Sequence, residues 1–278
     1  MTEGIHPTAL VDTAAQLGAG VTIGAFTVVG PEVTLGDGVE IGHHVVLEGR
    51  VEIGARAKLG HGSVLGGLPQ DLKFKPGTPS GVRVGAGTAI REYVTIHRAT
   101  TPEAWTQIGE GCLIMAMAHV AHDCRVGDGA IVINYAGITG HCEIGERATV
   151  GGLSGMLPFT RVGAYAYIGG ASKVTHDVPP FTIVDGNPAS AHAINVVGLR
   201  RAGIPPAERA LLREAYRLLY RRGLPPPAAI ARIRAELPAT GFVKQLTEFV
   251  EASRRGICPA AEERGTGPVD GDAGGEEV

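Results

Sequence analysis

An aliphatic residue recurs at every sixth position over most of this chain, and this repeat restricts the possible folds more than any other feature. The series runs from Ile5 to Leu65, resumes at Val84 for three units, and continues from Ile108 to Val174. Every member is Val, Ile, Leu or Met, and the residue four places later is usually small or β-branched. Such a period indicates a repeat architecture, in which each unit buries its apolar face only by stacking on its neighbours.

The six-residue unit predicts a short strand followed by a turn. One large and one small side chain would point inward from each unit, and a glycine often follows the large one, as at Gly24 and Gly127. Three units would close a triangular coil, so residues 18 apart would stack on neighbouring coils about 4.8 Å apart. Cys124 and Cys142 are 18 apart at the small inward position, which indicates core residues rather than ligands or nucleophiles.

Two segments interrupt this stack, residues 70–83 and residues 97–107. Loops that project from a rigid stack are frequent positions for binding groups. The period ends after Pro179 and Pro180, and later leucines have helical spacing between prolines. We therefore expect a β-helix over residues 1–190 and an α-helical domain over 191–256. The Gly-rich, acidic segment 257–278 is predicted to be a disordered tail.

The composition excludes several classes of protein. With 44% hydrophobic residues the chain can bury a substantial core, and its net charge of −3 gives no case for nucleic-acid binding. Residues 191–256 alone contain 12 Lys or Arg and 5 Asp or Glu, a local net charge of +7. The first residues lack the pattern of a signal peptide, and no apolar run is long enough for a transmembrane segment. The four cysteines show no paired spacing typical of a zinc site or a disulfide framework, so we expect a cytoplasmic protein.

The residues with the most distinctive chemistry lie between His119 and Asp123. Adding one coil of 18 residues to His122 gives Gly140, so an imidazole would lie beside a backbone N–H that no side chain blocks. Acyl transfer to a hydroxyl needs a base such as histidine and a donor that stabilises the oxyanion. No Ser or Cys is obviously activated, which favours direct attack over a covalent intermediate. Neighbouring strand residues point to opposite faces, so Asp123 can assist His122 only from a turn.

The repeat resembles that of the hexapeptide-repeat acyltransferases, whose fold is a left-handed parallel β-helix. Five further motifs are similar, in order and spacing, to one family within this class. They are Gln70 to Lys73 (QDLK), Val94 to Arg98 (VTIHR), Ala121 to Cys124 (AHDC), Asp177 to Pro180 (DVPP) and Asn195 to Arg201 (NVVGLRR). That family is the acyl-carrier-protein–UDP-N-acetylglucosamine O-acyltransferases, the first enzymes of lipid A biosynthesis. The resemblance covers nearly all of residues 5–256.

The resemblance implies a role for each matching position. His122 would be the general base, Asp123 the acid that assists it, and Gly140 the oxyanion donor. Substrate-binding positions would be Gln70, Asp71, Lys73, His119, His141, Gly170, Asn195 and Arg201. The resemblance also implies a homotrimer with sites between subunits and no metal or other cofactor. The acyl donor would be a (R)-3-hydroxyacyl chain on acidic acyl carrier protein, which suits the positive charge of residues 191–256.

This sequence departs from the family at several binding positions, namely Leu157, Pro158, Pro188, Val197 and Ala202. These departures leave open a related enzyme that uses a 3-amino sugar nucleotide or an acyl-coenzyme A donor. A γ-class carbonic anhydrase is a further alternative, but it needs three neutral imidazoles on one metal. Its usual close pair of histidines is five residues apart, whereas His119 and His122 are three apart. A non-catalytic scaffold is the remaining alternative.

Overall fold

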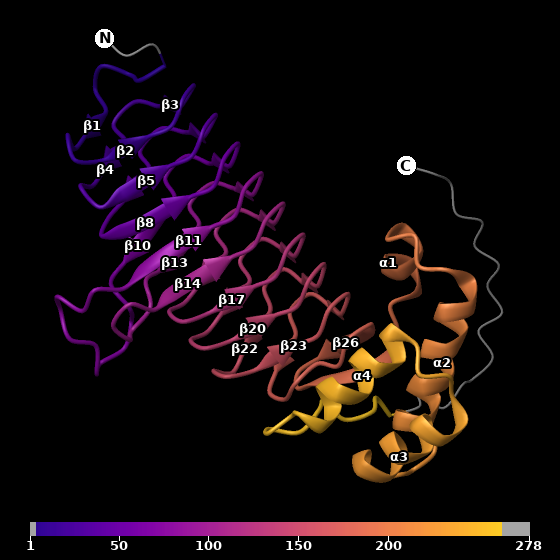
Figure 1. The fold of residues 1–278 in the computed structure, drawn as a ribbon. Coiled ribbons are helices and arrows are strands. Elements are labelled where there is room, and N and C mark those ends of the chain that lie inside the picture. Colours follow the sequence, from indigo (N-terminus) through magenta and orange to yellow (C-terminus); the bar gives the residue numbers. More distant parts are fainter. Residues whose placement is uncertain (1–3, 263–278) are drawn as a thin grey trace.

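The computed structural model describes residues 4–262, in which three sheets of almost entirely parallel strands form the faces of a triangular prism (Figure 1). Within these residues, sheet I has nine strands, sheet II eight and sheet III ten. From β1 to β25, successive strands belong to sheets I, II and III in turn, and each strand from β1 to β22 pairs with the strand three places later. At the C-terminal end β24 pairs with β26, and β26 pairs with β27. The three-unit coil predicted from the repeat is therefore confirmed.

Most strands are two residues long, and the pairing order of each sheet follows the prism axis. Sheet I comprises β1 (Leu10–Val11), β4 (Val28–Val29), β7 (Val46–Leu47), β10 (Val64–Gly67), β13 (Thr95–His97), β16 (His119–Val120), β19 (Gly137–Ile138), β22 (Gly155–Met156) and β25 (Lys173–Val174). Sheet II comprises β2 (Gln16–Leu17), β5 (Val33–Leu35), β8 (Arg50–Ile53), β11 (Gly81–Val84), β14 (Trp105–Ile108), β17 (Arg125–Val126), β20 (Glu143–Ile144) and β23 (Arg161–Val162). Sheet III comprises β3 (Thr22–Ile23), β6 (Glu40–Ile41), β9 (Lys58–Leu59), β12 (Ala89–Ile90), β15 (Leu113–Ile114), β18 (Ile131–Val132), β21 (Thr149–Val150), β24 (Tyr167–Ile168), β26 (Thr182–Gly186) and β27 (Ala189–Ile194).

The core lies along the axis of the prism. From Ile23 to Val174, every member of the six-residue series is at most 5% exposed. Ile5, Val11 and Leu17 are more exposed because they lie in the first coil, which has a neighbour on one side only. Cys124 and Cys142 are fully buried in this core, and burial raises the pKa of both thiols. Their predicted role as core residues is confirmed.

The two predicted interruptions are shorter than the sequence suggested. The first loop covers residues 68–80, because Gly81–Val84 is strand β11 and pairs with both β8 and β14. The second loop covers residues 98–104, because His97 ends β13 and Trp105 begins β14. Thr106 fills a fully buried inward position of β14. Because threonine is polar, the aliphatic pattern did not indicate a strand there. Both loops leave the prism at the corner between sheets I and II (Figure 1).

Four helices follow the prism within the described residues: α1 (Val196–Arg201), α2 (Pro206–Tyr220), α3 (Pro226–Glu236) and α4 (Gly241–Glu251). The predicted start of the helical domain at residue 191 falls inside strand β27, which pairs with β26 in antiparallel fashion. The helical spacing of the leucines predicts one apolar face with Leu211, Leu212, Ala215, Leu218 and Leu219. In α2 the last four of these are buried, and Leu211 is half-buried. None of the helices among residues 4–262 is long and apolar enough to span a membrane.

The predicted start of the disordered tail at residue 257 is wrong. Ile257 forms a β-bridge with Asp177, Ala260 forms one with Ala191, and Cys258 is fully buried. These backbone hydrogen bonds fix the segment against the last coil, although its sequence has no period. Residues 263–278, the rest of the predicted tail, lie outside the described part of the chain.

Candidate active site

The predicted catalytic residues lie at the corner between sheets I and II, in turns of successive coils. His122 and Asp123 form the turn between β16 and β17, and Gly140 and His141 form the turn between β19 and β20. Asp123 and His141 occupy the left-handed position of their turns, with φ of 59° and 61°, and Phe159 occupies it one coil later. The coil spacing predicted from the repeat therefore places His122 beside Gly140 and Asp123 beside His141.

The side chains of this corner form a continuous stack. The His122 and His141 rings meet edge to face with centroids 5.1 Å apart, and the His141 and Phe159 rings lie parallel at 4.5 Å. His122 Nδ1 lies 2.8 Å from Asp123 Oδ2, and the two side chains are 14% and 11% exposed. Because both residues lie in a turn and not in a strand, their side chains can meet at one site. This is the condition predicted for Asp123 to assist His122.

Hydrogen bonds to its carboxylate and from its backbone N–H fix Asp123. Both the backbone N–H and the hydroxyl of Thr100 donate to it, the hydroxyl at 2.7 Å. The backbone N–H of Asp123 donates to Thr106 Oγ1 at 2.8 Å. Burial of the carboxyl opposes its charge, but the hydrogen bonds from Thr100 and His122 outweigh burial and hold the pKa of Asp123 below its ordinary value. Asp123 is therefore an anion at neutral pH.

The ionised carboxylate determines the tautomer of His122. A carboxylate without a proton only accepts hydrogen bonds, so His122 Nδ1 must carry the hydrogen that it shares with Asp123. The other ring nitrogen, Nε2, then keeps a free lone pair and can accept a proton. This assignment follows from the hydrogen-bond network. His122 is thus held in the form that a general base requires.

Gly140 lies against the His122 ring. A Cβ at this position would lie 2.5 Å from His122 Cε1 and 2.7 Å from Nε2, closer than real Cβ contacts. Within residues 4–262 the Gly140 N–H donates no hydrogen bond to another group. The corner therefore offers an open N–H donor next to an imidazole with a free nitrogen.

His119 lies on β16, one step from the catalytic turn, in a more buried setting. Its Nδ1 is 2.7 Å from the hydroxyl of Thr95, and its ring is 4.7 Å from that of His97. Burial, assisted by the nearby imidazoles of His97 and His122, lowers the pKa of His119 to about 4. His119 is therefore neutral near pH 7 and suits hydrogen bonding rather than charge pairing.

The low pKa of His119 predicts a loss of stability in acid. Between about pH 6.5 and pH 4 the unfolded chain binds a proton at His119 that the folded chain does not, so the free energy of unfolding falls as pH is lowered. We expect His119→Asn to reduce this fall by about 1–2 kcal/mol between pH 7 and 4.5, after a discount for partial exposure. Urea unfolding at both pH values measures it, and equal losses in variant and parent would contradict it.

Three residues of this corner also have the geometry of a metal site. The ligand atoms of His122, Asp123 and His141 all lie within 4.8 Å of one another. Two imidazoles and a carboxylate differ from the three imidazoles of a carbonic anhydrase. In addition, His122 Nδ1 is already bonded to Asp123.

Of the other predicted binding residues, those of the 68–80 loop leave the prism at the same corner between sheets I and II, nearer its N-terminal end, whereas Gly170, Asn195 and Arg201 lie elsewhere. Gln70, Asp71 and Lys73 lie in the 68–80 loop, where Asp71 accepts the backbone N–H of Lys73 at 2.9 Å. Among residues 4–262, no hydrogen bond or ion pair joins them to His122. Gly170 lies in the turn between β24 and β25, at the corner between sheets III and I.

Asn195 and Arg201 line a separate pocket of about 580 Å³ on the outer face of sheet III. Asn195 is largely committed to the fold. Its Oδ1 accepts the backbone N–H of Gly198 and caps α1, while its Nδ2 donates to the carbonyl of Tyr165. Arg201 is exposed at the end of α1 and forms no salt bridge within the described residues. Two groups of predicted residues therefore lie on different faces of the prism.

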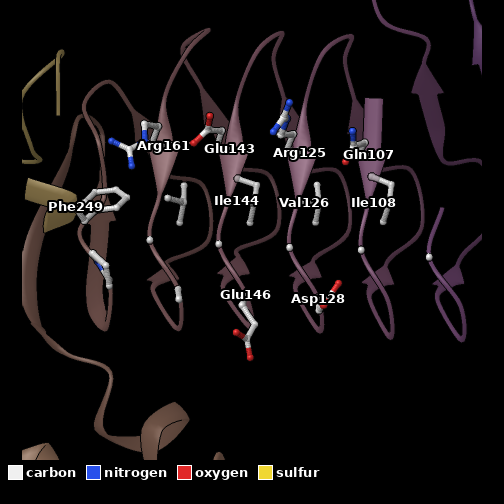
Figure 2. A pocket seen from close by; sticks show the side chains of 18 of the residues that line it. Gln107, Ile108, Arg125, Val126, Asp128, Glu143, Ile144, Glu146, Arg161 and Phe249 are labelled. Carbon is white, nitrogen blue, oxygen red and sulfur yellow. Dashed lines mark hydrogen bonds and ion pairs between the residues drawn. The ribbon is translucent and has the colours of Figure 1, made fainter. Parts of the chain in front are cut away.

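The outer face of sheet II, next to the catalytic corner, has a row of polar side chains. Gln107, Arg125, Glu143 and Arg161 lie side by side on neighbouring strands and line a pocket of about 600 Å³ (Figure 2). Arg161 pairs with Glu143 at 3.3 Å, and its guanidinium lies 4.5 Å from the ring centre of Phe249 on α4. The sequence did not predict this face as a binding surface.

Three contacts of this site were not predicted from the sequence. Thr100 and Thr106 form hydrogen bonds with Asp123, and Phe159 stacks on His141. Thr100 contacts Asp123 across a coil that the 98–104 loop lengthens, as the pairing of Thr95 with His119 shows. Residues 18 apart stack only on regular coils, so this spacing does not predict a contact across a lengthened coil. Phe159, in contrast, lies one regular coil after His141, and the same rule could have found it.

A parallel prism of six-residue units with a largely buried His–Asp pair in one of its turns is typical of the hexapeptide-repeat acyltransferases. A family model described as bacterial transferase hexapeptide (six repeats) matches residues 14–49, 32–67 and 106–140. A second, described as Udp N-acetylglucosamine O-acyltransferase, Domain 2, matches residues 177–258. The chain belongs to the acyl-[acyl-carrier-protein]–UDP-N-acetylglucosamine O-acyltransferase family, as its relatives establish.

A relative with that name from Sulfurihydrogenibium sp. is 55% identical over 94% of this chain and 96% of its own length. Another from Thermodesulfovibrio yellowstonii is 42% identical over 91% of this chain and 98% of its own. The solved structure of LpxA from Acinetobacter baumannii is 39% identical, has a TM-score of 0.88, and is matched over 92% of this chain and all of that one. The predicted fold class, a left-handed parallel β-helix of hexapeptide repeats with C-terminal helices, is confirmed.

Proposed function

We propose that this chain transfers a (R)-3-hydroxyacyl group from acyl carrier protein to the 3-hydroxyl of UDP-N-acetylglucosamine, the first step of lipid A biosynthesis, in the cytoplasm. The observation that carries the mechanism is the contact between His122 and Asp123 beside the open Gly140 N–H. The names of the relatives support the two substrates. No metal or other cofactor is needed for this chemistry.

The geometry supports a single direct transfer. His122 Nε2 removes the proton of the sugar 3-hydroxyl while that oxygen attacks the thioester carbonyl carbon. The carbonyl oxygen becomes negative in the tetrahedral intermediate, and the Gly140 N–H stabilises it. The intermediate collapses to the ester, the C–S bond breaks, and the departing sulfur takes the proton from His122. Asp123 keeps the ring oriented and stabilises the imidazolium between the two proton transfers.

A homotrimer would explain why the predicted residues are dispersed. His122 lies at the corner of sheets I and II, whereas Asn195 and Arg201 line a pocket on sheet III. One chain cannot bring opposite parts of a rigid prism together, but two neighbouring copies can. We propose that each site combines the His122 corner of one subunit with the α1 pocket of the next. The same site between two subunits would be lined by the turn at Gly170 and by the 68–80 loop, with Gln70, Asp71 and Lys73.

An acylation assay tests the function. The purified protein is mixed with UDP-N-acetylglucosamine and a panel of (R)-3-hydroxyacyl carrier proteins, and the acylated sugar nucleotide is detected by mass. A parallel reaction contains the 3-amino analogue, which distinguishes ester from amide formation. We expect ester formation on the natural sugar. A further reaction supplies (R)-3-hydroxyacyl-coenzyme A in place of the carrier protein. The proposal would be abandoned if no carrier protein in the panel acylated either sugar, or if only the coenzyme A thioester served as donor.

A further inference from the structure

A third pocket, of about 740 Å³, begins at the His141–Phe159 stack and extends toward the C-terminal segment. His141 and Phe159 line one side of it, while Arg161, Arg254 and Arg255 line another. His122, His141 and Phe159 belong to successive coils, so the pocket opens about 10 Å along the prism from the base, at about 4.8 Å for each coil. A group bound there could belong to a molecule whose reacting atom lies at His122.

The two arginines at residues 254 and 255 are presented by a fixed segment of backbone. On one side of them, Ser253 Oγ donates to Asp177 Oδ2 at 2.8 Å. On the other side, the Gly256 carbonyl accepts the backbone N–H of Asp177 at 3.0 Å. Asp177 is 1% exposed and also accepts the backbone N–H of Arg161. Asp177 thus anchors both flanks of the arginine pair, one through its buried carboxylate and the other through its backbone N–H, and both arginines line the pocket.

The charge of this pocket is not balanced by nearby carboxylates. Glu143 pairs with Arg161, and the Asp177 carboxylate is occupied by its bonds to Ser253 and the Arg161 backbone. Arg255 donates to the carbonyl of Pro158 at 2.8 Å. In the described part of the chain neither Arg254 nor Arg255 has a carboxylate partner. Two guanidinium groups beside an aromatic ring therefore face open space near the reaction centre.

We propose that this pocket binds a phosphate group of one of the two substrates, with Arg254 and Arg255 as its ligands. Guanidinium groups bind phosphate through paired, charge-assisted hydrogen bonds. Both substrates of the proposed function carry phosphate: the sugar nucleotide as a diphosphate, and the acyl donor as the diester of its phosphopantetheine arm. The inference rests on the proposed function for the identity of these molecules, and it assigns a binding role to residues outside the motifs of the sequence.

Binding measurements identify which substrate supplies the phosphate. Titration calorimetry is performed with UDP and with 4′-phosphopantetheine on the parent protein, Arg254→Glu and Arg255→Glu. We expect charge reversal to weaken one of the two probes about 10- to 100-fold, the range for a lost charge-assisted hydrogen bond. The KM of the matching substrate should rise by a similar factor, while the KM of the other stays within about twofold.

A matched control reverses an equivalent charge elsewhere. Arg213 is exposed on α2 and lines none of the pockets described above, so Arg213→Glu changes the net charge equally and should alter neither probe. The inference is overturned if the parent binds neither probe, or if both arginine variants bind both probes as the parent does. If the parent protein binds UDP or 4′-phosphopantetheine but transfers no acyl group, the proposed function is refuted while the inference that the pocket binds phosphate is retained. Thermal unfolding checks that each variant is folded.

Discussion

Replacing His122 with Asn is expected to lower kcat/KM for acyl transfer by about 10²- to 10⁴-fold, the usual contribution of a positioned general base. The amide keeps a group able to donate to Asp123 but has no nitrogen that accepts a proton. His122 lies in a turn outside the hydrophobic core, and asparagine keeps its hydrogen bond to Asp123, so the free energy of unfolding should change little. Steady-state rates with saturating (R)-3-hydroxyacyl carrier protein and varied UDP-N-acetylglucosamine give kcat/KM. Urea unfolding gives the free energy of unfolding.

The role of Asp123 can be separated from that of His122 with a double variant. If Asp123 acts only by orienting the imidazole, Asp123→Asn should lower the rate in the parent but not in the His122→Asn background, because the two residues work as a unit. His192→Asn is the control, since His192 is an exposed histidine on β27 away from the corner. Full activity in His122→Asn would refute the proposed mechanism, and additive losses would show an independent task for Asp123.

The prism and the centre of the site could be predicted from the sequence because stacked coils convert sequence spacing into spatial contact. A residue and its successor one regular coil later lie one strand spacing apart, so the contact of His122 with Gly140 follows from their numbers alone. The method fails where a coil gains residues. The 68–80 loop lengthens the coil between Ile53 and its partner Val84, and the contact of Thr100 with Asp123 crosses the coil that the 98–104 loop lengthens.

Segments without a period were predicted less well, for a related physical reason. Residues 257–262 have no apolar pattern, yet backbone hydrogen bonds to the last coil order them, as between Cys258 N–H and the carbonyl of Asp177. Such bonds depend on any residue's N–H and C=O, so composition does not reveal them. The pocket at Arg254 and Arg255 depends in the same way on the contacts of Ser253 and Gly256 with Asp177, which explains why the sequence did not indicate it. The side-chain periods predicted the scaffold, but not the backbone contacts that complete its C-terminal end.

Gly140 allows a prediction that distinguishes its chemical role from a structural one. Its φ does not lie in the left-handed region, so alanine is not excluded by the backbone conformation. The obstacle is the His122 ring, which lies 2.5 Å from where the Cβ would be. Alanine would therefore push the imidazole away from both Gly140 and its present position against Asp123. A misplacement of about 1 Å at a reacting group is enough to lower a rate by about 10²-fold.

We therefore expect Gly140→Ala to lower kcat about 100-fold or more with little change in the KM of either substrate. Gly137→Ala is the matched control, because Gly137 belongs to the same coil and a Cβ there would meet no atom within 4 Å. If the defect comes from displacement of the ring, Gly140→Ala should cost little further in the His122→Asn background, where no base remains to displace. A large additional loss in that background would instead mean that the N–H itself stabilises the oxyanion and has moved with the turn. A rate equal to the parent's would remove Gly140 from the site altogether.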